Sequence, residues 1–185
     1  MISVNDFHTG VSIELEGELW QVVEFQHVKP GKGSPFVRAK LRNIRKDFTV
    51  EKTFRGGEKV KRAIIERRPA QYLYMQDEFF TFMDAGSYEQ YMVTEELLGD
   101  GKKWLKDGME VMLVYHGDQV IGVEMPNFVE LEVTVTDPGF KGDTATGGTK
   151  PATVETGAVV QVPLFIEVGD RLQIDTRTGA YLKRV

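Results

Sequence analysis

Residues 27–43 read HVKPGKGSPFVRAKLRN, and this stretch decides the fold of the first third of the chain. Residues 19–26, LWQVVEFQ, precede its loop and are rich in β-branched and aromatic side chains. Residues 36–42, FVRAKLR, follow the loop and alternate apolar with basic side chains. Two strand patterns joined by a short segment of Gly and Pro predict a β-hairpin with an extended loop.

The loop of this hairpin is built to hold Lys32 at its tip. Proline at the base of a loop restricts φ and lowers the entropy lost on ordering it. Glycine on either side of the lysine lets the backbone take positive φ there. The residues predicted to support the loop are Pro30, Gly31, Gly33, Ser34 and Pro35.

Three basic residues follow the loop at alternate positions, namely Arg38, Lys40 and Arg42. Side chains alternate between the two faces of a strand, so these three are predicted to share one face. Residues 1–64 carry a net charge of +4, residues 65–128 carry −7, and residues 129–185 carry −2. The basic face is therefore a candidate RNA-binding surface at the one positively charged end of the chain.

The chemistry of Lys32 has three interpretations. A lysine at a hairpin tip is most often a solvated turn residue. A lysine that forms a Schiff base needs burial or a neighbouring cation to lower its pKa, and the pattern suggests an exposed position. A third interpretation, contact with RNA, agrees with the basic strand behind it. No catalytic residue is predicted.

Composition excludes several classes of site. The chain of 185 residues has no cysteine, and its histidines His8, His27 and His116 are not at metal-ligand spacing. We therefore expect neither a metal nor a cofactor. The first residues lack the pattern of a signal peptide, and no apolar run approaches the length needed to cross a bilayer. These features predict a cytoplasmic protein with no membrane partner.

Strand and turn signals predict an all-β chain of three small barrels. Five short strands in residues 1–65 suggest an SH3-like barrel with Trp20 and Phe25 in its core. Residues 66–128 suggest an OB-like barrel with one helical turn at residues 94–98, and residues 129–185 a second OB-like barrel. The last barrel is predicted to contain a strand at residues 165–168 and a long loop at residues 137–150.

Two further segments each leave an alternative open. The aromatic residues between 71 and 93 are interpreted as barrel core or as a platform for stacking bases. The Gly/Thr loop lacks the Gly-Lys-Ser/Thr and following helix of a phosphate-binding loop. It is interpreted as a flexible surface loop or as a backbone-rich RNA contact. Its candidate contact residues are Gly142, Asp143, Thr144, Thr146, Gly147, Gly148, Thr149 and Lys150.

Two long runs in this order resemble the bacterial translation elongation factor P family. The first is FQHVKPGKGSPFVRAKLRN, and the second extends from KGDTATGGTKPATVETGAVVQVPLFIEVGD to RLQIDTRTGAYLKR. With the opening ISVNDF, the resemblance covers the whole chain. It implies a KOW-like (SH3-like) barrel and two OB-fold barrels in an L-shaped row with the outline of a tRNA.

The resemblance also implies a function. Such factors bind the ribosome beside the peptidyl-tRNA and promote peptide-bond formation at consecutive prolines. Lys32 would reach toward the peptidyl-transferase centre, in some members after extension by a modifying enzyme, and the Gly142–Lys150 residues would contact the ribosome. A monomer is expected. The alternative functions are a general SH3/OB RNA-binding module without ribosome specificity, and a lysine-dependent enzyme.

Overall fold

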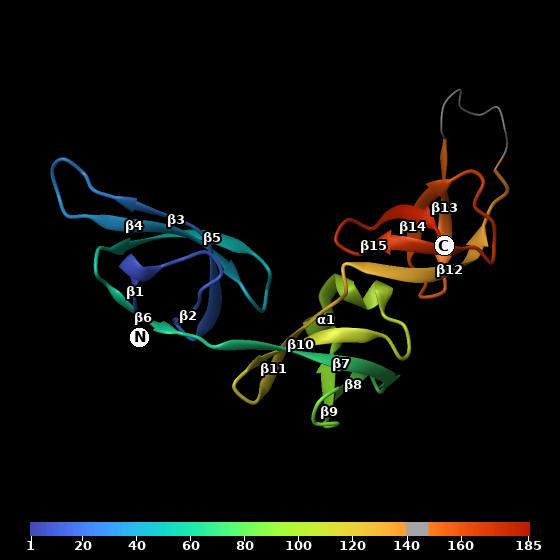
Figure 1. The fold of residues 1–185 in the computed structure, drawn as a ribbon, viewed down its shortest axis with the longest axis horizontal. Coiled ribbons are helices and arrows are strands. Elements are labelled where there is room, and N and C mark those ends of the chain that lie inside the picture. The colour runs from blue at the N-terminus through green and yellow to red at the C-terminus, as the bar shows by residue number, and fades with distance from the viewer. Residues whose placement is uncertain (140–147) are drawn as a thin grey trace. The chain divides into compact units, whose positions relative to one another are not determined.

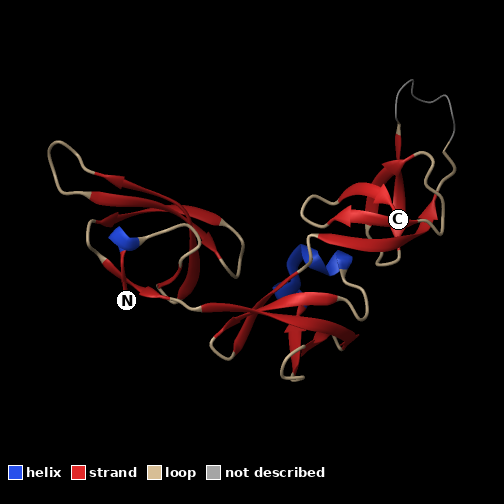
Figure 2. Ribbon diagram, viewed as in Figure 1, coloured by secondary structure: helices blue, strands red, loops and turns tan. Residues whose placement is uncertain are grey.

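The computed structural model describes residues 1–139 and 148–185 (Figure 1). Strands dominate, and the helices are short (Figure 2). The described helices are η1 (Val4–Asp6), α1 (Glu95–Leu98) and η2 (Gly99–Trp104). The strands form three separate sheets, so the prediction of an all-β fold is confirmed. No helix among the described residues is both long and apolar enough to cross a membrane.

The first sheet has the order β1-β6-β2-β3-β4-β5. Its strands are β1 (Ile2–Ser3), β2 (Ser12–Leu15), β3 (Glu18–Val28), β4 (Phe36–Asn43), β5 (Thr49–Arg55) and β6 (Lys59–Arg62). Its apolar faces enclose a core that includes Ile13, Val22, Leu41 and Phe54. The core prediction was wrong for Trp20 and Phe25. Both are only partly buried and pack against the cluster from outside it.

The second sheet has the order β11-β10-β7-β8-β9. Its strands are β7 (Ile65–Gln76), β8 (Phe79–Asp84), β9 (Gln90–Thr94), β10 (Glu110–His116) and β11 (Gln119–Glu124). The predicted helical turn is α1, although Thr94 makes no side-chain hydrogen bond as its cap. Phe80 and Phe82 lie buried and contact Tyr72, whereas Tyr74 and Phe79 stay exposed. Part of the aromatic segment is therefore core, and part is surface.

The third sheet has the order β14-β13-β12-β15-β16. Its strands are β12 (Phe128–Thr136), β13 (Thr149–Val154), β14 (Val159–Pro163), β15 (Arg171–Asp175) and β16 (Ala180–Arg184). The strand predicted at residues 165–168 was wrong, because these residues form turns. The fifth strand of the sheet is instead β13. It was not predicted, because its residues include Thr and Pro151 and follow a Gly-rich run, which are features typical of a loop.

The chain divides into two compact units. One contains Met1–Arg67 together with Val114–Gly122, and the other contains Arg68–Leu113 and Val123–Val185. In the first unit, Val114 and Ile121 at the tip of the β10–β11 hairpin pack against Leu19 and Ala63. The boundary between the first two barrels was predicted after residue 65. The strand β7 spans this position, so no loop separates the two segments there.

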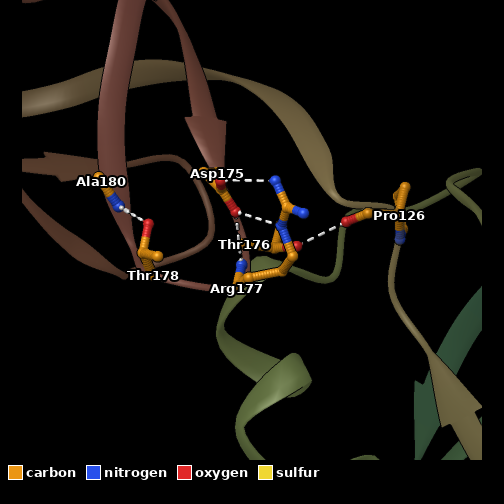
Figure 3. Close-up of polar contacts among 6 residues, drawn as sticks. All are labelled: Pro126, Asp175, Thr176, Arg177, Thr178 and Ala180. Atoms are coloured by element: carbon orange, nitrogen blue, oxygen red, sulfur yellow. Dashed lines mark hydrogen bonds and ion pairs between the residues drawn. The ribbon is translucent and has the colours of Figure 1, made fainter.

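Inside the second unit, residues of the middle segment are built into the last barrel. Trp104 lies in the same core cluster as Val129 and Leu172. The turn between β15 and β16 binds the connecting segment, since the Thr176 hydroxyl donates a 2.6 Å hydrogen bond to the Pro126 carbonyl (Figure 3). The guanidinium of Arg177 beside Asp175 holds the pKa of that carboxyl below its usual range and stiffens the turn.

Candidate functional site

The β3–β4 hairpin carries residues 29–35, which we call the Lys32 loop. The two strands are 11 and 8 residues long, and their last pair before the loop is Val28 with Phe36. Figure 1 shows the hairpin extending beyond the other strands of its sheet, with the loop at its end. Long antiparallel strands alone can hold a loop this far from its own barrel, because every added pair contributes ladder hydrogen bonds.

Glycine serves the Lys32 loop at one of the two expected positions. Gly33 has a φ of +114°, a conformation that an L side chain rarely adopts. The expectation for Gly31 was wrong, since its φ lies outside the left-handed region. Lys32 is exposed, and no ion pair or hydrogen bond of its ammonium is found among the described residues. The loop therefore presents one long cation to solvent.

The turn between β5 and β6, residues 55–58, lies against the base of the loop. The Gly56 N–H donates a 2.9 Å hydrogen bond to the Pro35 carbonyl. The Gly57 N–H donates to Oδ1 of Asn5 at 3.2 Å. A cavity of about 510 Å³ opens beside this contact, with His27 and Lys29 among its lining residues. Lys32 does not line this cavity, so the cavity does not bury Lys32 as a Schiff-base lysine would require.

The basic residues behind the loop share one face, but their charges are partly offset. Burial alternates along β4, so Arg38, Lys40 and Arg42 are exposed while the residues between them are buried. Each lies near a carboxylate: Arg38 Nε is 3.3 Å from Glu51, Lys40 Nζ is 3.9 Å from Glu24, and Arg42 Nε is 3.1 Å from Asp47. The predicted basic face is therefore present, and each of its three cations forms an exposed ion pair.

A polar cluster closes the far end of β4. Oδ1 of the fully buried Asn43 accepts hydrogen bonds from the backbone N–H groups of Arg45 and Lys46, at 3.0 and 2.9 Å. Its amide donates to Glu18, whose other oxygen is 2.7 Å from Lys46 Nζ. Hydrogen bonds from Lys46 and Asn43 lower the pKa of Glu18. The cluster fixes the β4–β5 turn and with it the register of the hairpin.

The second predicted contact region lies only partly within the described residues. Gly142, Asp143, Thr144, Thr146 and Gly147 fall outside them. Of the remaining three, Gly148 precedes β13, and Thr149 and Lys150 are its first residues. Lys150 does not fit the expectation of a surface contact. Only 7% of it is exposed, and its ammonium donates a 2.5 Å hydrogen bond to the Asp137 carbonyl.

Sequence reasoning missed three residues near the Lys32 loop. Lys29 adds a second exposed cation to the loop, and Asn5 and Gly56 hold the turn beneath it. The pair Gly56-Gly57 is typical of a turn, but nothing in the local sequence shows which segment a turn will contact. In the described part of the chain, no group of His, Cys, Asp or Glu could hold a metal ion.

Three family models match consecutive parts of the chain. The elongation factor P KOW-like domain matches residues 3–60, the elongation factor P OB domain residues 65–123, and the elongation factor P C-terminal domain residues 129–184. Proteins called Elongation factor P are similar over the full length of both chains: 62% identical in Pelotomaculum thermopropionicum, 60% in Carboxydothermus hydrogenoformans and 58% in Gloeothece citriformis.

Solved structures support the fold. The structure titled eukaryotic translation initiation factor 5A, from Methanococcus jannaschii, superposes with a TM-score of 0.53 at 24% identity. It covers 68% of this chain and 90% of its own. A translation initiation factor 5A family protein from Naegleria fowleri gives 0.54 at 11% identity, covering 67% and 96%. The domain models and the full-length relatives lead to one conclusion: the chain belongs to the elongation factor P family of translation factors.

Proposed function

We propose that the protein binds the ribosome beside the peptidyl-tRNA and promotes peptide-bond formation between consecutive prolines. The observation that carries this proposal is the Lys32 loop at the end of its long hairpin, in a chain of the elongation factor P family. A proline ring constrains both the incoming nucleophile and the nascent chain, so the reaction is slow until the reactants are oriented.

The role of each part follows from its chemistry. The Lys32 ammonium reaches toward the peptidyl-transferase centre and there contacts RNA or the end of the peptidyl-tRNA. The exposed residues Arg38, Lys40 and Arg42 contact RNA phosphates. On binding, these phosphates replace the carboxylates that pair with the three cations in the free protein. Residues 142–149 form a second contact with the ribosome. The factor orients the reactants and forms no covalent bond with them, so it is not an enzyme in its own right. It acts in the cytoplasm, as a monomeric translation factor.

Lys32 is also our candidate for post-translational extension by a modifying enzyme. It is exposed, has no ion-pair partner among the described residues, and lies in a loop that another active site could enclose. Intact mass and peptide mapping of the natively expressed protein measure this directly. An adduct confined to Lys32 supports the assignment, and an adduct on Lys29 alone contradicts it.

The general RNA-binding alternative is the weaker one. Exposed aromatic residues do occur, among them Tyr74, Phe79 and Tyr88. They lie in residues 65–128, however, where the net charge is −7. A surface for single-stranded RNA combines aromatic side chains with basic ones, so these residues do not favour it.

Lys32→Ala is the direct test, with Lys29→Ala as the matched comparison. Both lysines are exposed and belong to the same loop, so each substitution removes one charge from nearly the same place. A reconstituted system without endogenous factor would translate reporter messages with and without three consecutive proline codons. We expect Lys32→Ala to lose on the order of a hundredfold in the rate at prolines, and Lys29→Ala much less.

Neither substitution should alter folding. The Lys32 side chain buries little, so Lys32→Ala should change the free energy of unfolding by no more than about 0.5 kcal/mol. Equal rescue of the proline message by Lys32→Ala and the native protein would contradict the proposed role of the tip. An equal loss on both messages would indicate a general function in translation.

A further inference from the structure

We propose that the β5–β6 turn, acting through Gly56, is a positioning element that sets the direction of the Lys32 loop. Gly56 is distant from Lys32 in sequence and is not part of the loop. It nevertheless contacts the residue at which the loop rejoins β4, because its N–H donates to the Pro35 carbonyl at 2.9 Å. The inference rests on the proposed function of Lys32 and adds a second segment to it.

Glycine at position 56 allows this contact to be close. A Cβ placed there would lie 3.0 Å from the Pro35 carbonyl oxygen and 3.3 Å from its Cγ. These distances are tighter than nine in ten real Cβ contacts, so Pro35 would have to shift by a few tenths of an ångström, and its backbone oxygen cannot rotate away as a side chain can. The φ of Gly56 lies outside the left-handed region, so glycine is needed here for close approach and not for backbone conformation.

The turn is itself held on its other side. Gly57 donates to Asn5, and the Val4 N–H donates a 2.8 Å hydrogen bond to the Glu58 carbonyl. Arg55 pairs with Phe36, the first residue of β4 after the loop. The turn is therefore held by the N-terminal segment and, through the end of β5, by the first residue of β4, so it has little freedom to yield.

The loop, by contrast, has space to move. The cavity of about 510 Å³ beside the contact is lined by His27 and Lys29 on the opposite stem, so side chains do not fill the space under the loop. Lys32 lies at the tip of the loop, three residues from Pro35 at its base. A shift of a few tenths of an ångström at Pro35 moves the ammonium farther, and orientation at a reacting centre is steeply sensitive to such displacement.

The test is Gly56→Ala in the proline-message assay. We expect ribosome affinity to be unchanged and the rate at proline codons to fall roughly tenfold. Gly122→Ala is the control, because a Cβ there would meet its nearest neighbour, Val114, at an ordinary 3.9 Å. Should Gly56→Ala fail to fold, Asn5→Ala loosens the same turn by removing the acceptor of Gly57 without adding an atom near Pro35.

A double mutant separates positioning from a general structural effect. If Gly56 acts by aiming Lys32, then Gly56→Ala causes no further loss once Lys32→Ala is present. The inference is overturned if Gly56→Ala, or Asn5→Ala in its place, keeps the native rate while Lys32→Ala loses it. Additive losses in the double mutant overturn it as well. If Lys32→Ala itself keeps the native rate, the proposed function fails, and this inference fails with it.

Discussion

Gly139 precedes residues 140–147 and Lys150 follows them, and both are unusually constrained. Lys150 is buried and donates to the Asp137 carbonyl. Gly139 packs so tightly that a Cβ would lie 2.3 Å from the carbonyl oxygen of Leu164. The base of this segment is thus fixed by a charge-assisted hydrogen bond on one side and by a close backbone approach on the other.

The first residue-scale prediction concerns Gly139→Ala. The new methyl group has to displace backbone, because Leu164 presents its carbonyl oxygen, carbonyl carbon and Cβ within 3 Å. Overpacking of this kind should lower the free energy of unfolding by about 1–3 kcal/mol. Chemical denaturation of this variant beside Gly122→Ala measures it. An unchanged midpoint would show that residues 137–139 yield freely.

Asn43→Ala is the second residue-scale prediction. Asn43 is fully buried, and its side chain accepts two backbone N–H groups and donates to Glu18. Removing it leaves both N–H groups and one carboxylate oxygen without that partner, at a cost of about 1–3 kcal/mol. Asn43→Asp retains the acceptor but brings a second negative charge to Glu18, and should therefore also destabilise. Stability equal to the native protein in both variants would contradict this account.

At the scale of the element, β4 carries the basic surface that we propose to contact RNA. Its buried positions are Val37, Ala39, Leu41 and Asn43, and its exposed positions carry the three cations. Exposed ion pairs contribute little to stability, about 0–1 kcal/mol each. The carboxylates therefore do not hold these cations firmly, and a phosphate can replace them.

Neutralising the cations of this face and neutralising their carboxylate partners should have opposite effects on ribosome binding. Replacing Arg38, Lys40 and Arg42 with Gln should weaken ribosome binding and flatten its salt dependence, because fewer counterions are released. Replacing the paired carboxylates, as Glu24→Gln, Asp47→Asn and Glu51→Gln, should strengthen binding, because it leaves the cations unopposed. A salt titration of ribosome affinity measures both. Identical slopes for all three proteins would show that RNA contacts another face.

At the scale of the whole molecule, the units do not coincide with the three barrels. Trp104 belongs to the middle segment by sequence but to the core of the last barrel by packing. Lys106 continues this contact, with its ammonium 3.0 Å from Glu155. The Thr156 hydroxyl adds a 2.5 Å hydrogen bond to the Lys103 carbonyl. Residues 103–106 therefore join two sheets into one compact unit.

Trp104→Ala should destabilise this unit strongly. The indole is 2% exposed and is surrounded by apolar side chains of the third sheet. Truncating a buried Trp costs about 3–5 kcal/mol, and Trp104→Phe should cost less because it fills more of the space. Denaturation followed by circular dichroism measures both variants. A loss below about 1 kcal/mol for Trp104→Ala would contradict the packing described here.

Acid should act on the same contact through Glu155. Burial raises the pKa of this carboxyl, but hydrogen bonds from Lys106 and from the Glu132 N–H outweigh it, so the pKa lies below the ordinary value of 4.5. Because the folded pKa is lowered, the stabilisation is complete above the unfolded pKa and is lost as the pH falls through the folded one.

Glu155→Gln removes this titration, so its stability should fall less steeply than that of the native protein between about pH 5 and pH 3. Denaturation midpoints across this range measure the difference. Glu130→Gln is the control, since Glu130 is exposed and forms no ion pair within the described parts of the chain. A native slope in Glu155→Gln would assign the acid sensitivity to another group.

The sequence by itself determined the strand-rich class, the β3–β4 hairpin and the place of Lys32 at its tip. These depend on local patterns: alternation along residues 36–42, and Gly and Pro between two strands. The helical turn that ends at Leu98 and the exposure of Arg38, Lys40 and Arg42 were also predicted from local sequence patterns. The family resemblance rested on two long runs and was confirmed by the domain models.

Only the tertiary structure decided which distant segments meet. Glu24, Asp47 and Glu51 come from other parts of the chain to pair with the cations of β4, and Gly56 approaches Pro35 from a different hairpin. The strand β13 is recognisable as a strand because β12 and β14 pair with it, although its own residues resemble a loop. The period of the apolar residues indicates which face of a single strand or helix is buried. Contacts between elements depend instead on loop lengths, register and twist, which no local pattern encodes.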